Sequence, residues 1–333
     1  MATITYREAV RQALREEMLR DQRVFLMGED IGRYGGSYAV TKGLLEEFGE
    51  ERVRDTPISE TAIVGAGIGA AMMGLRPVVE IMTINFLLVA LDQVINNAAK
   101  FYSMFGGQFS VPLVIRTVGG GRRLAATHSQ NLEPLLAHIP GLKVVAPATP
   151  YDAKGLLKAA IRDGDPVVFI EHSLLYGVRG EVPEDDYVVP IGVSDVKRRG
   201  RDVTIVAHSR MTQEALIAAE KLAQQGIEAE VIDLRTLRPL DMGPVLDSVM
   251  RTNRVVVAGE DWRSFGIGAE VAARIQEEAF DWLDAPVLRV NQKEAPLPYA
   301  ANLEQLALPN HDDIVDACLQ VLNIRIGGTA AAR

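Results

Sequence analysis

The sequence predicts an α/β fold in two domains, and three observations carry that prediction. Short apolar runs suited to buried strands alternate with stretches of helical periodicity along nearly the whole chain. A segment rich in proline, glycine and charge, residues 177–200, interrupts this alternation near the middle. The 333 residues exceed the size of one ordinary domain, and 48% hydrophobic with 24% charged residues is enough for two packed cores.

The N-terminal domain is expected over residues 1–185. It begins with an amphipathic helix over residues 4–19, with Thr5 near the helix N-terminus, and continues with the buried strand Val24–Met27, which ends at Gly28. Further strands are predicted at 78–84, 111–116, 142–146 and 167–170, and helices at 61–74, 87–103, 131–138 and 152–163. This order is typical of a parallel sheet covered by helices on both faces.

A linker is expected over residues 186–200, followed by a smaller α/β domain over residues 201–325. Its predicted strands are Val203–Ala207, Ala229–Asp233, Val255–Ala258 and Val287–Val290, and its predicted helices lie near 211–225, 241–250, 268–279 and 311–323. Residues 326–333 have no packing pattern and are expected to form a flexible tail.

Composition argues against several classes of protein. No apolar run reaches the roughly 18 residues that a membrane span needs, and the N-terminus is too polar for a signal peptide. A net charge of -9 without a dense Lys/Arg cluster argues against a nucleic-acid partner. Cys318 cannot form an internal disulfide, and its place in a helical pattern predicts burial.

Glu60 is the most informative candidate residue. The segment Asp55–Glu60 ends a predicted strand just before a glycine-rich helix. Apolar neighbours there could desolvate the carboxylate, which could then exchange a proton with a heterocyclic nitrogen. The structural alternative is helix capping, with Ser59 as the N-cap and Glu60 favourable to the helix dipole. From spacing alone, capping is the better-supported interpretation.

Three further residues have both a functional and a structural interpretation. His128 follows the glycine-rich stretch 119–127, so its imidazole could meet a substrate from a loop, although loop histidines are usually structural or solvated. Phe86 could stack against a ligand or simply pack in the core. Glu29 follows a predicted strand and could cap a turn.

The glycine-rich helix does not complete a phosphate site. Gly65-Ala-Gly67, followed by Asn96–Asn97, mimics the two ends of the motif that holds magnesium and diphosphate in thiamine enzymes, but Ala66 stands where that motif needs an aspartate ligand. The glycines lack the acidic partner of a dinucleotide fingerprint, so close helix packing is the better explanation. Walker A, zinc-type and nucleophile-elbow motifs are absent from the sequence.

Along residues 4 to 323 the chain resembles the beta subunits of the E1 component of 2-oxo acid dehydrogenase complexes. The segments that carry the resemblance are Gly28–Gly32, Arg52–Glu60, Gly74–Pro77, Ala90–Asn96, His128–Gln130, Pro140–Val145 and Asp152–Leu157. The resemblance implies an N-terminal thiamine diphosphate-binding domain of the pyrimidine type and a transketolase-like C-terminal domain. It also implies a site split between chains, in which an alpha subunit holds magnesium and diphosphate, and this accounts for Ala66.

The resemblance also implies roles for individual residues. Glu60 would hydrogen-bond the aminopyrimidine and promote its imino form, and His128 would transfer protons. The other cofactor-binding residues implied are Glu29, Ile58, Ser59, Met82 and Phe86, and those toward the substrate are Thr83, Ile84, Asn85, Phe86 and His128. A potassium-type cation is implied on backbone carbonyls of Leu113, Ala160, Ile161, Asp163 and Asp165, where the structural alternative is an ordinary turn.

The implied reaction is oxidative decarboxylation of a 2-oxo acid and reductive acylation of a lipoyl group on an E2 acyltransferase, by a heterotetramer of two alpha and two beta subunits. The C-terminal domain would serve dimerisation and E2 docking. The run Glu80–Phe86 resembles the pyruvate branch of the family, although Thr127 stands where pyruvate members usually have glutamine, and nothing explains Arg122 and Arg123. A bacterial cytoplasm is expected, because Met1 is not preceded by a leader rich in Arg and Ser.

Alternatives stay open at this point. Branched-chain 2-oxo acids are the second choice of substrate, because one or two methylenes in a pocket change preference by only about 1–3 kcal/mol. A beta subunit of an acetoin dehydrogenase is a further alternative. From other classes, a non-catalytic scaffold subunit would retain the fold alone, and a nicotinamide-dependent dehydrogenase would bind its cofactor without a partner.

Overall fold

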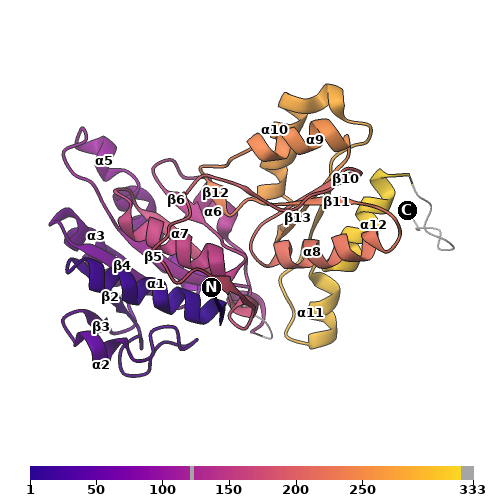
Figure 1. The fold of residues 1–333 in the computed structure, drawn as a ribbon. Helices are drawn as coiled ribbons and strands as arrows, with labels where there is room; N and C mark the ends of the chain where they lie inside the picture. Colours follow the sequence, from indigo (N-terminus) through magenta and orange to yellow (C-terminus); the bar gives the residue numbers. More distant parts are fainter. Residues whose placement is uncertain (121–123, 324–333) are drawn as a thin grey trace. The chain divides into compact units, whose positions relative to one another are not determined.

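The computed structural model describes residues 1–120 and 124–323 and consists of two compact units (Figure 1). The first unit is Met1–Gly192 together with Thr236–Pro239, and the second is Val193–Arg235 together with the chain from Leu240 onward. Each unit is α/β, which confirms the predicted fold class. Arg122, Arg123 and the expected tail at 326–333 lie outside the described residues.

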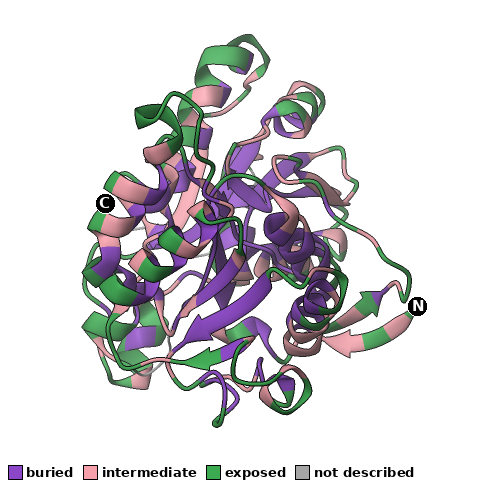
Figure 2. Ribbon diagram, turned by 90° about the vertical axis from the view of Figure 1, so that its left-hand side faces the viewer, coloured by how far each residue is buried: buried purple, intermediate pink, exposed green. Residues whose placement is uncertain are grey.

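A seven-stranded sheet organises the first unit, with the strand order β12-β6-β7-β5-β4-β2-β3. Its strands are β2 (Val24–Gly28), β3 (Val53–Asp55), β4 (Arg76–Ile81), β5 (Val114–Gly119), β6 (Lys143–Val145), β7 (Val167–His172) and β12 (Thr236–Arg238). All neighbours pair in parallel except β12, which pairs antiparallel with β6. Strands β2, β5 and β7 are buried along their whole length, as expected for a sheet covered on both faces (Figure 2).

Helices cover the two faces of this sheet. On one face, α1 (Tyr6–Arg20) and α7 (Pro150–Arg162) contribute Leu14 and Leu156 to a core shared with Leu26 and Val78. On the other face lies α3 (Glu60–Met72), where a Cβ added at Gly67 would stand 2.7 Å from Val79 Cγ1. Close helix–sheet packing therefore explains Gly67, as predicted.

The remaining elements of the first unit are short. Strands β1 (Ala2–Thr5) and β8 (Arg179–Val182) form an antiparallel pair. The other helical segments are α2 (Leu44–Phe48), α4 (Ile84–Leu87), η1 (Leu88–Ala90), η2 (Gln93–Ala98), α5 (Phe101–Met104), η3 (Ala126–His128), α6 (Glu133–Ala137) and η4 (Ser173–Leu175). The single helix expected over 87–103 is thus broken into η1, the π-helical η2 and α5, because the backbone hydrogen-bond pattern changes along this stretch.

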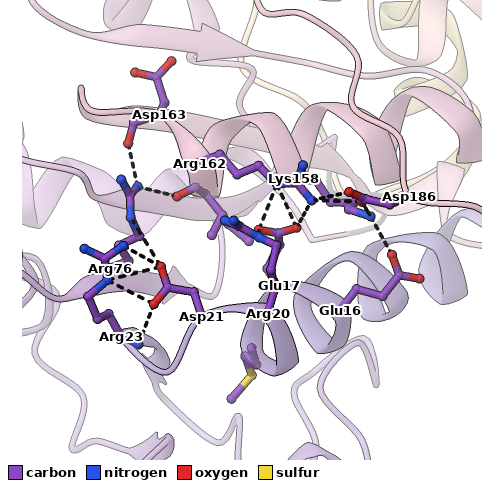
Figure 3. Close-up of polar contacts among 12 residues, drawn as sticks. Glu16, Glu17, Arg20, Asp21, Arg23, Arg76, Lys158, Arg162, Asp163 and Asp186 are labelled. Carbon is purple, nitrogen blue, oxygen red and sulfur yellow. Dashed lines mark hydrogen bonds and ion pairs between the residues drawn. The ribbon is translucent and has the colours of Figure 1, made fainter.

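Ion pairs join α1 to α7 across their packed faces (Figure 3). Lys154 and Lys158 are only 2% and 1% exposed, and each ammonium lies 2.7 Å from a carboxylate oxygen of Glu16. Arg162 reaches the buried Glu17 at 2.6 Å. These partners make burial of the lysines tolerable, because a buried charge is strongly unfavourable unless it is paired.

The second unit is a five-stranded sheet with the order β14-β13-β10-β11-β9. Its strands are β9 (Asp195–Arg198), β10 (Val203–Ala207), β11 (Ala229–Asp233), β13 (Val255–Trp262) and β14 (Leu288–Gln292), parallel except for β9. Its helices are α8 (Arg210–Ala223), α9 (Gly243–Thr252), α10 (Ile267–Ala279), η5 (Phe280–Trp282), α11 (Ala301–Ala307) and α12 (His311–Val321). Cys318 on α12 is fully buried, which confirms its predicted packing role.

Two edge strands lie outside the expected domain boundaries. Strand β9 falls within the expected linker 186–200, where it pairs antiparallel with β11. Strand β12 falls within the expected C-terminal domain 201–325 but completes the sheet of the first unit. Both are short pairings between distant segments, and local periodicity cannot reveal such pairings. In the part of the chain that the structure describes, no helix combines the length and apolarity that a membrane span requires.

Arg116 on β5 joins three strands of the first unit through buried charges. Its guanidinium pairs with Glu80 on β4, and its Nε and Nη2 lie 2.5 and 3.0 Å from the Glu171 carboxylate on β7. The Tyr176 hydroxyl donates to the same carboxylate at 2.8 Å. Burial opposes the charge on Arg116, but Glu171 and Glu80 outweigh burial and hold its pKa above the ordinary value. Burial likewise raises the pKa of Glu80, against the attraction of Arg116.

We expect Arg116→Met to destabilise the first unit by about 3–5 kcal/mol, because two buried carboxylates then lose their counterion. The loss should be larger near pH 8 than near pH 5. A buried acid with a raised pKa is ionised more readily in the unfolded state, so rising pH costs stability. Urea unfolding followed by hydrogen exchange of peptides from β4, β5 and β7 measures the change.

The control is Arg15→Met, which removes a half-exposed pair with Glu47 and should change stability by less than about 1 kcal/mol. Equal effects of the two substitutions would contradict the role given to Arg116.

Candidate active site

The predicted site residues follow four neighbouring strands of one sheet. Glu29 follows β2, the segment Ile58–Glu60 follows β3, Met82–Phe86 follows β4, and His128 lies in the connection after β5. These strands are adjacent and parallel in the order β5-β4-β2-β3, so their carboxyl ends share one edge. In parallel α/β sheets, ligands bind outside this edge.

Glu60 is the first residue of α3, and it is partly buried. Ser59 precedes the helix, but its side chain makes no capping hydrogen bond, so the capping interpretation loses its main contact. Ile58 is 73% exposed. Burial raises the pKa of Glu29, and the charges of Asp30 and Glu60 raise it further. Glu29 and Glu60 are therefore close enough for each carboxylate to experience the other's charge.

His128 and Phe86 are in direct contact. The phenyl ring meets the imidazole edge-on, with centroids 5.3 Å apart and planes at 84°. The Thr127 hydroxyl lies 3.0 Å from His128 Nδ1. Within the described residues, no hydrogen bond to His128 Nε2 is present.

Thr83 and Asn85 connect the end of β4 to the segment that follows His128. Thr83 Oγ1 donates to the Val118 carbonyl at 3.2 Å and accepts from Asn85 Nδ2 at 2.7 Å. Asn85 Oδ1 accepts from the backbone N–H and the side-chain Nε2 of Gln130, at 3.1 and 3.2 Å. Of their neighbours in the predicted set, Ile84 is 1% exposed and lies in the core, and Met82 is partly buried.

Two residues of this arrangement were missed from sequence. Thr127 was noted only as a departure from pyruvate members, and the structure gives its hydroxyl a contact with the histidine ring. Gln130 was noted only as part of a motif, and the structure gives it two hydrogen bonds to Asn85. No periodicity or spacing signals the bonds between Asn85 and Gln130, because they join segments 45 residues apart.

Two cationic side chains contact residues of the expected potassium site, and Figure 3 shows one of them, Arg76, beside Asp163. Arg76 Nη1 donates to the carbonyls of Ile161 and Asp163 at 2.7 and 2.8 Å. Lys143 lies 2.8 Å from the Asp163 carboxylate and 3.0 Å from that of Asp165. The Leu113 carbonyl accepts from the Val167 N–H at 2.9 Å, and the Ala160 carbonyl accepts from the Asp163 N–H at 3.3 Å. Each carbonyl oxygen keeps a second lone pair.

The site fits one half of a thiamine diphosphate molecule. Carboxylates and an aromatic ring at the sheet edge suit the aminopyrimidine, which needs a proton-exchanging partner and an apolar surface. Across residues 1–120 and 124–323, no group of three or more His, Cys, Asp or Glu side chains could hold a metal ion.

Two family models match the two α/β units. The model "Transketolase, pyrimidine binding domain" matches residues 2–178, and "Transketolase, C-terminal domain" matches residues 192–314. A solved chain described as "Split gene transketolase, inactive beta4 tetramer" superimposes with a TM-score of 0.78 at 26% identity, covering 96% of this chain and 99% of that one. Fold and site thus define a protein of the transketolase type.

Curated relatives identify a particular family within this class. The pyruvate dehydrogenase E1 component subunit beta of Rhizobium meliloti is 53% identical over 95% of this chain and 69% of its own length. The subunit of the same name from Rickettsia felis is 50% identical over 96% of this chain and 98% of its own length. The mitochondrial subunit from Bos taurus is 49% identical over 96% and 91%. The chain belongs to the family of pyruvate dehydrogenase E1 beta subunits.

We expect Glu29→Gln to stabilise the protein near neutral pH. The raised pKa of Glu29 means that its ionised form is less favourable in the folded chain than in the unfolded one. This cost is absent below the ordinary pKa of a glutamate and present above the raised value. Thermal unfolding between about pH 4 and pH 8 should show the variant's advantage growing with pH. A stability gain of Glu29→Gln that stays constant or shrinks with rising pH would contradict the raised pKa of Glu29.

Proposed function

We propose that this chain is the beta subunit of a pyruvate dehydrogenase E1 enzyme. The reaction is thiamine diphosphate-dependent oxidative decarboxylation of pyruvate, with reductive acetylation of the lipoyl group of an E2 acyltransferase. The observation that carries the proposal is the gathering of Glu29, Glu60, Phe86 and His128 at one sheet edge. The names of the relatives support pyruvate, and none of those described above is a branched-chain or acetoin enzyme.

The residues of this chain have distinct parts in the proposed reaction. Bound thiamine diphosphate supplies the carbon nucleophile and the electron sink. Glu60 would hold the aminopyrimidine by a hydrogen bond and could move a proton at its carboxylate, and Glu29, Ile58 and Ser59 would line the same side of the site. Met82 and Phe86 supply an apolar surface, and Thr83, Ile84 and Asn85 lie on the substrate side. His128 moves a proton to or from the substrate through Nε2.

Catalysis requires an alpha subunit, which would provide the magnesium and diphosphate ligands. Ala66 in place of an acidic ligand supports this division. The solved relative is itself described as an inactive tetramer of beta chains. We propose a heterotetramer of two alpha and two beta subunits, which delivers its product to lipoylated E2.

We expect this chain to copurify with a partner that carries an intact Gly-Asp-Gly to Asn diphosphate motif, identified by mass spectrometry. The complex should decarboxylate pyruvate when thiamine diphosphate and magnesium are present. Glu60→Gln should lower this activity by roughly 10²–10⁴-fold, because an amide of the same shape cannot exchange the proton.

The matched control is Glu46→Gln, at an exposed position on α2, which should leave activity unchanged. A homo-oligomer without such a partner would remove the E1 assignment. Full activity of the Glu60→Gln complex would favour the scaffold alternative instead.

We also propose that a potassium ion uses the free lone pairs of the carbonyls at Leu113, Ala160, Ile161, Asp163 and Asp165. Carboxylates of Asp21, Asp163 and Asp165 balance the nearby charges of Arg76 and Lys143, which supports this proposal. An ion present at ten times its dissociation constant stabilises the folded state by about 1.4 kcal/mol. The thermal unfolding midpoint should therefore be higher in potassium chloride than in tetramethylammonium chloride of equal strength. Equal midpoints would exclude the ion.

A further inference from the structure

Asn85 spends almost all of its hydrogen-bonding capacity inside the protein. It is 6% exposed, and its Oδ1 accepts from both the backbone N–H and the side-chain Nε2 of Gln130. Its Nδ2 donates to Thr83, whose hydroxyl donates in turn to Val118 on β5. A side-chain amide offers two acceptor lone pairs and two donor hydrogens. Within residues 1–120 and 124–323, one Nδ2 hydrogen of Asn85 is left without a hydrogen-bond partner.

The Asn85 contacts hold the segment that carries His128. Gln130 lies two residues after His128, so the two Cα atoms are at most about 7 Å apart along the chain. His128 is exposed, whereas Ser129 and Asn131 are 1% and 6% exposed. The exposed imidazole is therefore followed by buried residues, and hydrogen bonds to Asn85 hold the segment at Gln130.

Phe86, the residue after Asn85, packs against the imidazole ring of the same histidine. Its phenyl edge meets the imidazole at a centroid distance of 5.3 Å. Two adjacent residues thus act on the His128 segment in different ways: Asn85 bonds to Gln130, two residues after the histidine, and Phe86 packs against the imidazole ring. Both depend on α4 (Ile84–Leu87), whose N-terminus Thr83 caps.

We propose that Asn85 is a positioning residue that fixes His128 for proton transfer and does not itself bind the 2-oxo acid. The catalytic part of this inference rests on the proposed function, whereas its structural part does not. Small displacements of a proton-transfer group are costly, because the group must lie within hydrogen-bond reach of the atom it serves.

The structural part is tested by hydrogen exchange at the Gln130 amide. Asn85→Ala should speed exchange at this amide by about 5- to 10-fold, the worth of one hydrogen bond. Asn85→Asp keeps an acceptor for Gln130 and should retain most of the protection. The control Asn96→Ala removes an exposed asparagine bonded to Asp92 and should change nothing at Gln130. Unchanged exchange in Asn85→Ala would overturn the proposal, provided that β5 and β7 peptides keep their own protection.

The catalytic part is tested in the assembled complex by a double-mutant cycle. Asn85→Ala should lower kcat for pyruvate about tenfold or more and leave KM within about twofold. In a His128→Ala background the same substitution should have no further effect, since the two residues act as a unit. A raised KM, or additive losses, would show that Asn85 acts on the substrate directly. An inactive wild-type complex would instead count against the proposed function, and the exchange result at Gln130 would still decide the structural part.

Discussion

The guanidinium of Arg116 is the interaction on which the site-bearing sheet depends. It neutralises Glu80 and Glu171 inside the sheet and so joins β4, β5 and β7 at their carboxyl ends. Without a buried cation these two carboxylates could not share the space, since each would lose its hydration without gaining a partner. The same strand ends carry Phe86, Asn85 and the connection to His128. The buried guanidinium of Arg116 therefore helps to hold together the strands that carry the predicted site residues.

Parallel pairing of the strands brings the predicted site residues to one edge of the sheet. Residues scattered from Glu29 to His128 come together because β2, β3, β4 and β5 are neighbours that point the same way. This arrangement also explains why the set is incomplete. The sheet edge supplies carboxylates, an aromatic ring and an imidazole, but the glycine helix α3 carries Ala66 where a metal ligand would be needed. The absence of an acidic side chain at position 66 is the feature on which the proposed division of the site between two chains rests.

Strong local patterns could be read from the sequence, and contacts between distant segments could not. The strands Val203–Ala207 and Ala229–Asp233 were predicted with their exact bounds, because each is a short apolar run between clear breaks. The broken helix after Phe86 was missed because its residues keep a helical period while the hydrogen bonding shifts to 3₁₀ and π patterns. The predicted roles of Glu60 and His128 come from the family resemblance, whereas the bonds from Asn85 to Gln130 depend on a tertiary arrangement that no spacing encodes.

Strand β12 has a consequence for the order in which the protein can form during synthesis. The chain leaves the first unit at Gly192, returns for Thr236–Pro239 and leaves again, so this sheet is not contiguous in the gene. A ribosome that has released only the first 192 residues has delivered a sheet whose β6 edge is still bare. Exposed strand edges invite pairing with other chains. Strand β6 therefore stays unpaired at this edge until β10, β11 and β12 have been made. A truncation at the apparent domain boundary would leave it unpaired permanently.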